Sequence, residues 1–404
     1  MSEWRKKQLQ EIAFLKPTET LKKGDIAPNI PMANIKEFQR DVVQIDYSEF
    51  KGGTKFRNGD TLLAKITPCL ENGKTAFVNC LQEDEIGFGS TEFIVLRAKE
   101  NIDERFLYYL SISPEFRKQA ISLMEGTSGR KRVNEHALKI SEFLIPDIEG
   151  QRKIANILSA IDDKIQINNQ INQELEAMAK TLYDYWFVQF DFPGQNGKPY
   201  KSSGGKMVYN PELKREIPEG WGVEKLGDIA NITMGQSPKG TSYNEVGEGM
   251  LFFQGSTDFG WRFPVARQYT TEPSRIAEED DILLSVRAPV GTLNIADTRC
   301  CIGRGLAAIN SKVGVNSYIF NVMQDFKKLF DMRNSVGTTF GSITKDDLYS
   351  LQLVYPPNEL LMKFDQSVKS FDREIKNRSR QNQGLTQLRD WLLPMLMNGQ
   401  VKVK

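Results

Sequence analysis

Histidine is almost absent from this sequence of 404 residues, and long apolar runs are missing. The single histidine, His136, excludes a metal site built from several imidazoles, and no nucleophile-elbow sequence accompanies it to suggest a Ser/His/Asp arrangement. No apolar stretch approaches the roughly 20 residues that cross a bilayer. The segment MSEWRKKQLQEIAFLKP lacks the apolar core and cleavage site of a signal peptide, so we expect a cytoplasmic protein.

Cysteine is scarce as well, and charge of one sign does not dominate. The four cysteines, Cys69, Cys80, Cys300 and Cys301, form no C-x-x-C pair and suggest no disulfide framework, which again favours a reducing compartment. The 53 Lys and Arg residues balance 52 Asp and Glu residues, which leaves a formal net charge of +1. This balance does not decide the partner, because a nucleic-acid binder can be globally neutral when its cations cluster on one face.

A nucleotide site is not expected in this chain. The stretch NGKT, Asn72–Thr75, looks like part of a phosphate loop, but a Walker A motif needs a glycine where the chain has Pro68. No Gly-x-Gly-x-x-Gly pattern occurs. We therefore expect the chain to carry no cofactor and no metal of its own.

What the sequence does contain is an internal repeat. GDTLLAKITP, Gly59–Pro68, is answered by DDILLSVRAP, Asp280–Pro289, and each predicts a buried strand that enters a turn. GSTEFIVLRA, Gly89–Ala98, has a looser partner in GRGLAAINSK, Gly303–Lys312, and a helical segment follows each. The repeats predict two similar α+β domains.

Each copy continues with a turn rich in glycine and hydroxyl groups, then a short helix, a strand and a proline. The first is EGTSGRKRVNEHALKISEFLIP, Glu125–Pro146, and the second is VGTTFGSITKDDLYSLQLVYPP, Val336–Pro357. Three cations, Arg130, Lys131 and Arg132, stand in the first turn, and the second turn is much less basic. We interpret the two turns as equivalent points of the two domains.

A long helix with a coiled-coil seam is expected at the end of each copy. The polar residues Asn168 and Asn172 interrupt the first seam, and Arg378 and Asn382 interrupt the second, about 210 residues later. The apolar seam positions are Ile154, Leu158, Ile161, Ile165, Leu175 and Leu182 in the first helix, and Phe364, Val368, Phe371, Ile375, Leu385 and Leu392 in the second.

The simplest partner for each seam is the other seam. We therefore predict an intramolecular antiparallel coiled coil with pseudo-twofold symmetry, in which the polar positions help to select one register. The alternative is that each seam packs on the helices of another protein. The predicted organisation is a first α+β domain over residues 1–149, a long helix over 150–190, a connector over 191–220, a second α+β domain over 221–357 and a second long helix over 358–404.

One pattern resembles a nuclease site. Pro146-Asp147 followed by Asp162-x-Lys164 fits the loose form in which two carboxylates hold Mg²⁺ and a lysine supports the attacking water. The second half has Asn358 and Glu374 at the corresponding places, and Asp162 is expected on the charged outer face of the helix. A binding module without catalysis is favoured. A divergent Mg²⁺-dependent nuclease and a repeat scaffold that binds only protein remain the alternatives.

DNA is the favoured ligand, because cations and hydroxyl groups recur on the turns of both halves. Arg and Lys neutralise phosphates, and Ser, Thr and exposed N–H groups fix the register on the backbone. Long helices between the two domains predict a split recognition site. The candidate DNA contacts are Lys65, Thr67, Lys74, Thr75, Ser128, Arg130, Lys131, Arg132, Gln236, Ser237, Lys239, Arg287, Arg304, Thr338, Thr339, Ser342 and Lys345.

Over nearly its whole length the chain resembles the specificity subunits of type I restriction-modification systems. The most specific stretches are residues 149–221, the closing LRDWLLPMLMNGQVKV, and GTSGRKRV with the segment that leads to FLIP. The resemblance implies a non-catalytic subunit whose two domains each read one half of a bipartite DNA target.

The resemblance also implies partners. Two modification subunits would bind S-adenosylmethionine and methylate adenine, and restriction subunits would hydrolyse ATP and cleave DNA. The paired helices would act as a ruler and as the docking surface for the modification subunits. S-adenosylmethionine, ATP and Mg²⁺ are thus expected on the partner subunits and not in this chain.

Overall fold

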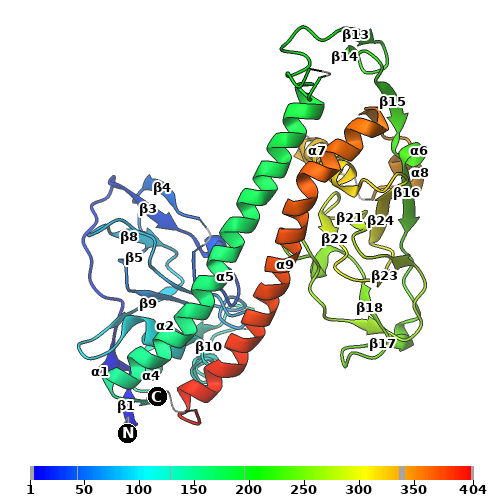
Figure 1. Cartoon of the computed structure of the whole chain (residues 1–404). Helices are drawn as coiled ribbons and strands as arrows, with labels where there is room; N and C mark the ends of the chain where they lie inside the picture. Colours follow the sequence, from blue (N-terminus) through cyan, green and yellow to red (C-terminus); the bar gives the residue numbers. More distant parts are fainter. Residues whose placement is uncertain (1–3, 43, 128, 195, 336–341, 402–404) are drawn as a thin grey trace. The chain divides into compact units, whose positions relative to one another are not determined.

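The computed structural model describes the chain except residues 1–3, 43, 128, 195, 336–341 and 402–404, and of residues 329–335 it describes only the backbone (Figure 1). The contacts divide the chain into two units. The first consists of Met1–Asn169 with Arg380–Lys404, and the second of Gln170–Ser379. Each unit contains one α+β domain and a part of both long helices. Among the described residues, no helix is long and apolar enough to cross a membrane.

Two four-stranded sheets form the first domain. One has the antiparallel order β2-β9-β6-β7, and the other has the order β4-β3-β8-β5 with a parallel pair, β3 and β8. The strands of the first sheet are β2 (Ala13–Leu15), β6 (Thr61–Ala64), β7 (Thr75–Phe77) and β9 (Phe93–Ala98). Those of the second are β3 (Ile26–Ile30), β4 (Asp46–Glu49), β5 (Thr54–Phe56) and β8 (Gly87–Gly89). All residues of β6 are buried, as its predicted apolar core requires.

Short helices and two small ribbons complete the first domain. Asp103, Ser113 and Asn134 cap the helices that follow them, because each side chain accepts hydrogen bonds from backbone N–H groups of the first turn. The elements are β1 (Arg5–Gln8), α1 (Leu9–Ile12), η1 (Met32–Asn34), α2 (Glu104–Ile112), α3 (Pro114–Ser122), β10 (Met124–Glu125), β11 (Arg132–Val133), α4 (Glu135–Lys139) and β12 (Glu142–Ile145). The ribbons are β1 with β12 and β10 with β11.

The second domain repeats this plan. Its first sheet has the order β16-β24-β21-β22, which matches β2-β9-β6-β7, and its second sheet again contains one parallel pair, β18 and β23. The first-sheet strands are β16 (Ala230–Met234), β21 (Ile282–Ser285), β22 (Leu293–Ile295) and β24 (Leu306–Ser311). The second sheet contains β17 (Tyr243–Asn244), β18 (Met250–Phe253), β19 (Tyr269–Thr270), β20 (Ile276–Ala277) and β23 (Cys300–Ile302).

The helices show where the two copies differ. The α2–α3 pair of the first domain is replaced by a single helix, α7 (Asn316–Ser335). The remaining elements of the second domain are β15 (Gly222–Lys225), α6 (Leu226–Ile229), η3 (Gly240–Ser242), η4 (Ser256–Asp258), α8 (Lys345–Tyr349) and β25 (Gln352–Tyr355), with β15 paired to β25. In the connector, β13 (Met207–Asn210) and β14 (Arg215–Pro218) form a hairpin.

The predicted long helices are α5 (Ile148–Tyr183), which continues into a π-helical turn at Asp184–Val188, and α9 (Asn358–Met397) (Figure 1). In the first unit Asp162 contacts Arg389 and Asn168 contacts Asn382. In the second unit Asn172 contacts Ser379. As α5 advances, the contacted position of α9 moves back, so the helices run antiparallel within each unit and the predicted intramolecular pairing is confirmed.

The seam packs inside the chain, as its apolar character predicts. Ile154, Leu158, Ile161, Phe364, Val368 and Ile375 are buried, and the other predicted apolar seam residues are half-buried. Ile154 and Leu158 belong to the core of the first domain together with Leu393 and Leu396 of α9. These seam side chains therefore stabilise their own unit.

Candidate nucleic-acid interface

The basic turn of the first domain is held against the end of β6. Thr67 donates its backbone N–H to the carbonyl of Lys131 (3.0 Å), and Val133 donates to the carbonyl of Lys65 (2.9 Å). The second domain repeats the arrangement at the end of β21, where Ser342 bridges to Arg287 and Ile343 donates to the carbonyl of Val286 (2.8 Å). In each domain the turn comes after the helical segment that follows the first sheet, and its described residues meet the end of a central strand, β6 or β21.

The three cations of the first turn are not equivalent. Arg130 and Lys131 are exposed. Arg132 makes a bidentate ion pair with Glu92, with Nη2 2.7 Å from Oε1 and Nε 2.9 Å from Oε2. The hydrogen bonds from Arg132 hold the pKa of Glu92 below its ordinary value. The turn therefore offers two exposed cations beside one that is already paired.

The other candidates of the first domain lie deeper. Lys65 is mostly buried, with Nζ 3.3 Å from Glu135 Oε1, and Lys74 donates to the carbonyl of Met32 (3.1 Å). Thr67 is half-buried, and its hydroxyl has no hydrogen-bond partner among the described residues. Thr75 requires a correction: it is 1% exposed in β7 and belongs to the core, because strand pairing turned its side chain inward.

The candidates of the second domain include more exposed groups. Gln236, Lys239, Arg287, Arg304, Ser342 and Lys345 are exposed. The Ser237 hydroxyl is half-buried and lies 3.0 Å from Gln254 Oε1. Lys345 Nζ lies 5.0 Å from the centroid of the Tyr349 ring. Three predicted contacts, Ser128, Thr338 and Thr339, lie outside the described residues.

A small pocket adjoins Arg287. Its volume is about 340 Å³, and it is lined by Gly255, Ser256, Thr257, Ser285, Arg287, Ala288, Pro289 and Gly305. Hydroxyl groups and an exposed guanidinium are the groups that bind phosphate oxygens and base edges. Sequence reasoning missed Ser256 and Thr257, because only the pairing of β18 with β23 brings their loop beside the end of β21.

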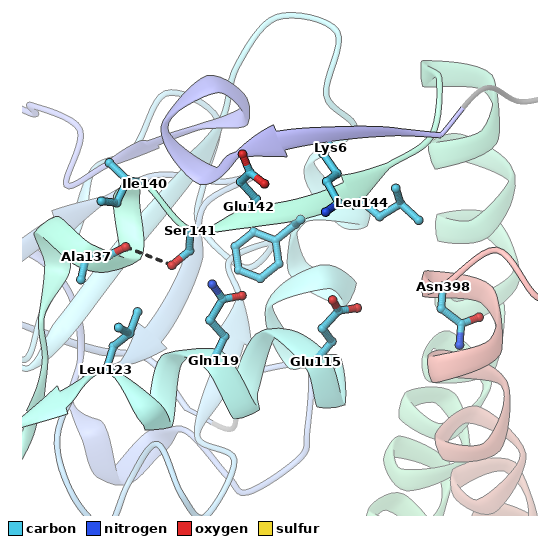
Figure 2. Close-up of a pocket in the computed structure, with 11 residues that line it drawn as sticks. Lys6, Glu115, Gln119, Leu123, Ala137, Ile140, Ser141, Glu142, Leu144 and Asn398 are labelled. Carbon is cyan, nitrogen blue, oxygen red and sulfur yellow. Dashed lines mark hydrogen bonds between the residues drawn. The ribbon is translucent and has the colours of Figure 1, made fainter.

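A larger pocket of the first domain has a different character (Figure 2). It measures about 650 Å³ and lies between α3 and the β1–β12 ribbon. The carboxylates of Glu115 and Glu142 line it along with Lys6, and the Ser141 hydroxyl donates to the carbonyl of Ala137 (3.0 Å). Two carboxylates repel phosphate, and none of the candidate DNA contacts lines this pocket.

The nuclease pattern does not assemble. Asp147 immediately precedes α5 and accepts a hydrogen bond from the N–H of Gly150 (2.8 Å), whereas Asp162 lies inside the helix. A helical rise of about 1.5 Å per residue separates them by about 22 Å, which is too far to share one metal ion. Among the described residues, no group of three or more His, Cys, Asp or Glu side chains could hold a metal.

The prediction that Asp162 lies on the charged outer face of the helix is wrong. Asp162 is 4% exposed, accepts a hydrogen bond from the Tyr109 hydroxyl at Oδ2 (2.7 Å) and pairs with Arg389 through Oδ1 (3.0 Å). Burial and the nearby Asp162 carboxylate both raise the pKa of Tyr109, so the phenol stays protonated and donates. Both carboxylate oxygens of Asp162 therefore serve the packing of α2 and α9 on α5.

The described residues form an internally duplicated protein of two α+β domains, and in each a segment that includes the described part of a predicted turn is held at the end of one central strand. A family model for the "Type I restriction modification DNA specificity domain" matches residues 1–177 and 218–386. The chain belongs to this family, as its sequence resemblance predicted.

Individual relatives agree with this assignment. The chain is 31% identical over 374 residues to the "Putative type I restriction enzyme MjaX specificity subunit" of Methanocaldococcus jannaschii, with 91% of this chain and 83% of the relative covered. It is 24% identical over 416 residues to the type I restriction enzyme HindI specificity subunit of Haemophilus influenzae, with 85% and 87% covered.

A solved structure shows the same fold. The type I restriction-modification system S subunit from M. genitalium is 16% identical, with a TM-score of 0.58, and the match covers 98% of this chain and 96% of that one. This likeness agrees with the predicted fold of two α+β domains and two long helices.

Proposed function

We propose that this chain is the DNA-recognition subunit of a type I restriction-modification complex, and that each domain reads one half of a bipartite target. The observation that carries the proposal is that the basic turn is held at the end of β6, and that Ser342 and Ile343, the described end of the second turn, are held at the end of β21. Exposed cations and hydroxyl groups at such a place can neutralise phosphates and reach base edges. The side chains differ between the domains, so the two half-sites would differ.

Modification subunits would dock on the outer faces of the long helices. In the first unit Leu388 and Trp391 are exposed one turn apart on α9. In the second unit Met178 of α5 is exposed, and so is Tyr185 of the π-helical turn that follows α5. Exposed apolar side chains in a row are typical of a surface that a partner covers. Met178 and Leu388 are about 210 residues apart, which is the spacing of the helix repeat. Each helix would therefore receive one modification subunit.

The chain itself would carry out no chemistry. The carboxylates of Asp147 and Asp162 are used for helix capping and for packing, which supports a non-catalytic role. S-adenosylmethionine would bind to the modification subunits, and ATP and Mg²⁺ to restriction subunits. The assembled complex would act on DNA in the cytoplasm.

Mapping methylated bases tests this proposal. DNA methylated by the complex of this chain with its modification subunits should carry a gapped motif with two defined halves. Replacing residues 1–149 by the first domain of another family member should change one half and leave the other half unchanged. The reciprocal replacement of residues 221–357 is the matched control, and it should change only the other half.

Two results would contradict the proposal. A motif that keeps both halves after each replacement would remove sequence recognition from these domains. A motif in which one replacement alters both halves would show that the domains do not divide the target.

A further inference from the structure

Two nearly buried arginines lie outside both the candidate DNA-contact set and the helix seam. Arg40 of the first domain is 6% exposed, and Arg262 of the second domain is 7% exposed. A guanidinium remains charged inside a protein. The loss of its hydration on burial costs on the order of several kcal/mol, and ion pairs and hydrogen bonds must compensate this cost. Their partners therefore indicate what the two residues hold together.

Arg40 joins the first domain to α5. Its Nη2 lies 2.7 Å from Asp163 Oδ1, and its Nη1 donates to the carbonyl of Ser159 (3.5 Å). Asp41 accepts from its Nε at 3.1 Å. Burial alone would lower the pKa of Arg40, but the hydrogen bonds and charge of Asp41 outweigh it and the pKa is raised. The guanidinium is thus held in its charged form against the helix.

In the second unit Arg262 joins the second domain to both long helices. Its Nη1 lies 3.0 Å from Glu176 Oε1 of α5, and its Nη2 lies 2.8 Å from Asp372 Oδ1 of α9. The guanidinium also stacks over the ring of Phe320 in α7, 3.9 Å from the ring centroid. A planar guanidinium suits this combination of two carboxylates and an aromatic face.

The two arginines occupy equivalent places in the repeat. Each lies in the loop that follows a single-turn helix, η1 before Arg40 and η4 before Arg262. The carbonyl of Arg40 accepts a hydrogen bond from the N–H of Phe77 in β7 (2.9 Å), and that of Arg262 accepts from Ile295 in β22 (2.9 Å). The strands β7 and β22 are equivalent edges of the two repeated sheets.

A continuous set of contacts therefore links helix and turn inside each unit. In the first unit it runs from Asp163 on α5 through the Arg40 side chain and the Arg40 carbonyl to β7. The strand β7 pairs with β6, and the end of β6 holds the basic turn. In the second unit the same contacts run from Arg262 through β22 to β21 and the described part of its turn.

We infer that Arg40 and Arg262 are positioning residues, and that each fixes the orientation of its recognition sheet on the long helices and thereby the way its domain presents the turn to one half-site. This inference rests on the proposed function. Hydrogen bonds to base edges tolerate little displacement. A domain whose sheet shifts on its helix therefore loses discrimination between DNA sequences before it loses DNA binding altogether.

The test uses the complete complex with its modification subunits. The measured quantity is the ratio of methylation at the cognate site to methylation at sites that carry a mismatch in the half read by the first domain. Arg40→Gln should lower this ratio by about tenfold, which is within the range that one mismatched base pair contributes. Discrimination in the other half should stay within twofold of wild type. Arg262→Gln should show the reverse. Arg40→Lys, which keeps the charge, should recover part of the lost ratio.

Matched controls separate positioning from general damage. Arg152→Gln removes an exposed arginine of α5 whose ion pair among the described residues is with Glu149, one turn away, and it should leave both ratios unchanged. Where Arg40→Gln fails to fold, Asp163→Asn replaces it, because Asp163 is 58% exposed and Arg40 keeps its pair with Asp41. It should lower the same ratio by a smaller factor.

Two outcomes overturn the inference. Unchanged ratios in both halves would leave Arg40 and Arg262 with a role in stability alone, and an equal loss in both halves would show a general defect. Failure of the proposed function would look different, because the unaltered complex would then methylate no gapped motif at all.

Discussion

Arg132 and Glu92 form a bidentate ion pair, with Arg132 Nη2 2.7 Å from Glu92 Oε1, so the third cation of the basic turn is neutralised within the domain. Arg130 and Lys131 remain exposed beside it. The local sequence shows three adjacent cations, and the fold makes one of them a support for the turn. This difference leads to two of the following predictions.

Arg130→Ala should weaken DNA binding by the assembled complex several-fold and lower the slope of log K against log salt by about 1, as expected for the loss of one phosphate contact. Arg132→Ala should also weaken binding, with a smaller change of slope, because its charge is already paired with Glu92. Fluorescence anisotropy at several salt concentrations measures both. The control is Arg152→Ala, and an unchanged slope for Arg130→Ala would remove the turn from the interface.

The Glu92 pair should make the first domain sensitive to acid. Hydrogen bonds from Arg132 lower the pKa of Glu92 in the folded chain. The pair therefore stabilises the fold fully above the unfolded-state pKa of about 4.3, and this stabilisation is lost as the pH falls through the lower folded-state value. Urea unfolding of wild type and Glu92→Gln should give different midpoints at pH 7 and converging midpoints below about pH 4. A gap that is independent of pH would contradict this origin.

The buried Asp162 should matter to stability. Asp162→Ala leaves Arg389 buried with only part of its pairing and should cost about 3–5 kcal/mol in the free energy of unfolding. Tyr109→Phe removes one hydrogen bond to Asp162 and should cost about 1–2 kcal/mol. Urea denaturation measures both changes. Glu174→Ala, at an exposed position of the same helix, provides the comparison, and an effect of Asp162→Ala no larger than that of Glu174→Ala would argue against the network.

The same residue distinguishes the non-catalytic assignment from the nuclease alternative. The purified chain with plasmid DNA and Mg²⁺ should produce no cleavage above a control without protein, because both carboxylate oxygens of Asp162 are engaged. Agarose gel electrophoresis of the plasmid gives the readout. Cleavage by wild type that Asp162→Ala abolishes would establish the nuclease instead.

The outer face of α9 should be required for assembly. Leu388→Glu with Trp391→Glu places charges on an exposed apolar row and should abolish co-elution with a modification subunit in size-exclusion chromatography. Deleting residues 378–404 should also impair assembly. Gln383→Glu, an exposed position on another side of the same helix, is the matched control. A normal complex with both apolar residues replaced would exclude this face as the docking surface.

The repeated framework was accessible from the sequence because its signals are local. Leu62 and Leu63, like Leu283 and Leu284, form short apolar runs next to turn residues, and the structure places both pairs in fully buried central strands. The seams of α5 and α9 were visible through their four-and-three spacing. The second sheet of each domain was not predicted, because its strands are short and its parallel pair joins segments far apart in the chain.

Charged residues show where local patterns stop. The periodicity of α5 placed Asp162 on the outer face, but Tyr109 and Arg389 bury it. Thr75 looked like a turn residue, but pairing of β7 with β6 turned it into the core. Periodicity indicates which side of an element is apolar, and it carries no information about which polar group finds a distant partner.

The sequence by itself therefore determined the duplication, the α+β class, the paired helices and the family, because each of these depends on neighbouring residues or on similarity. The tertiary structure decided the partners of the charged groups. In the folded chain Arg132 pairs with Glu92, Arg40 pairs with Asp163, and Arg262 pairs with Glu176 and Asp372. The physical reason is that a buried ion pair exists only when folding brings two distant side chains together and removes water from both.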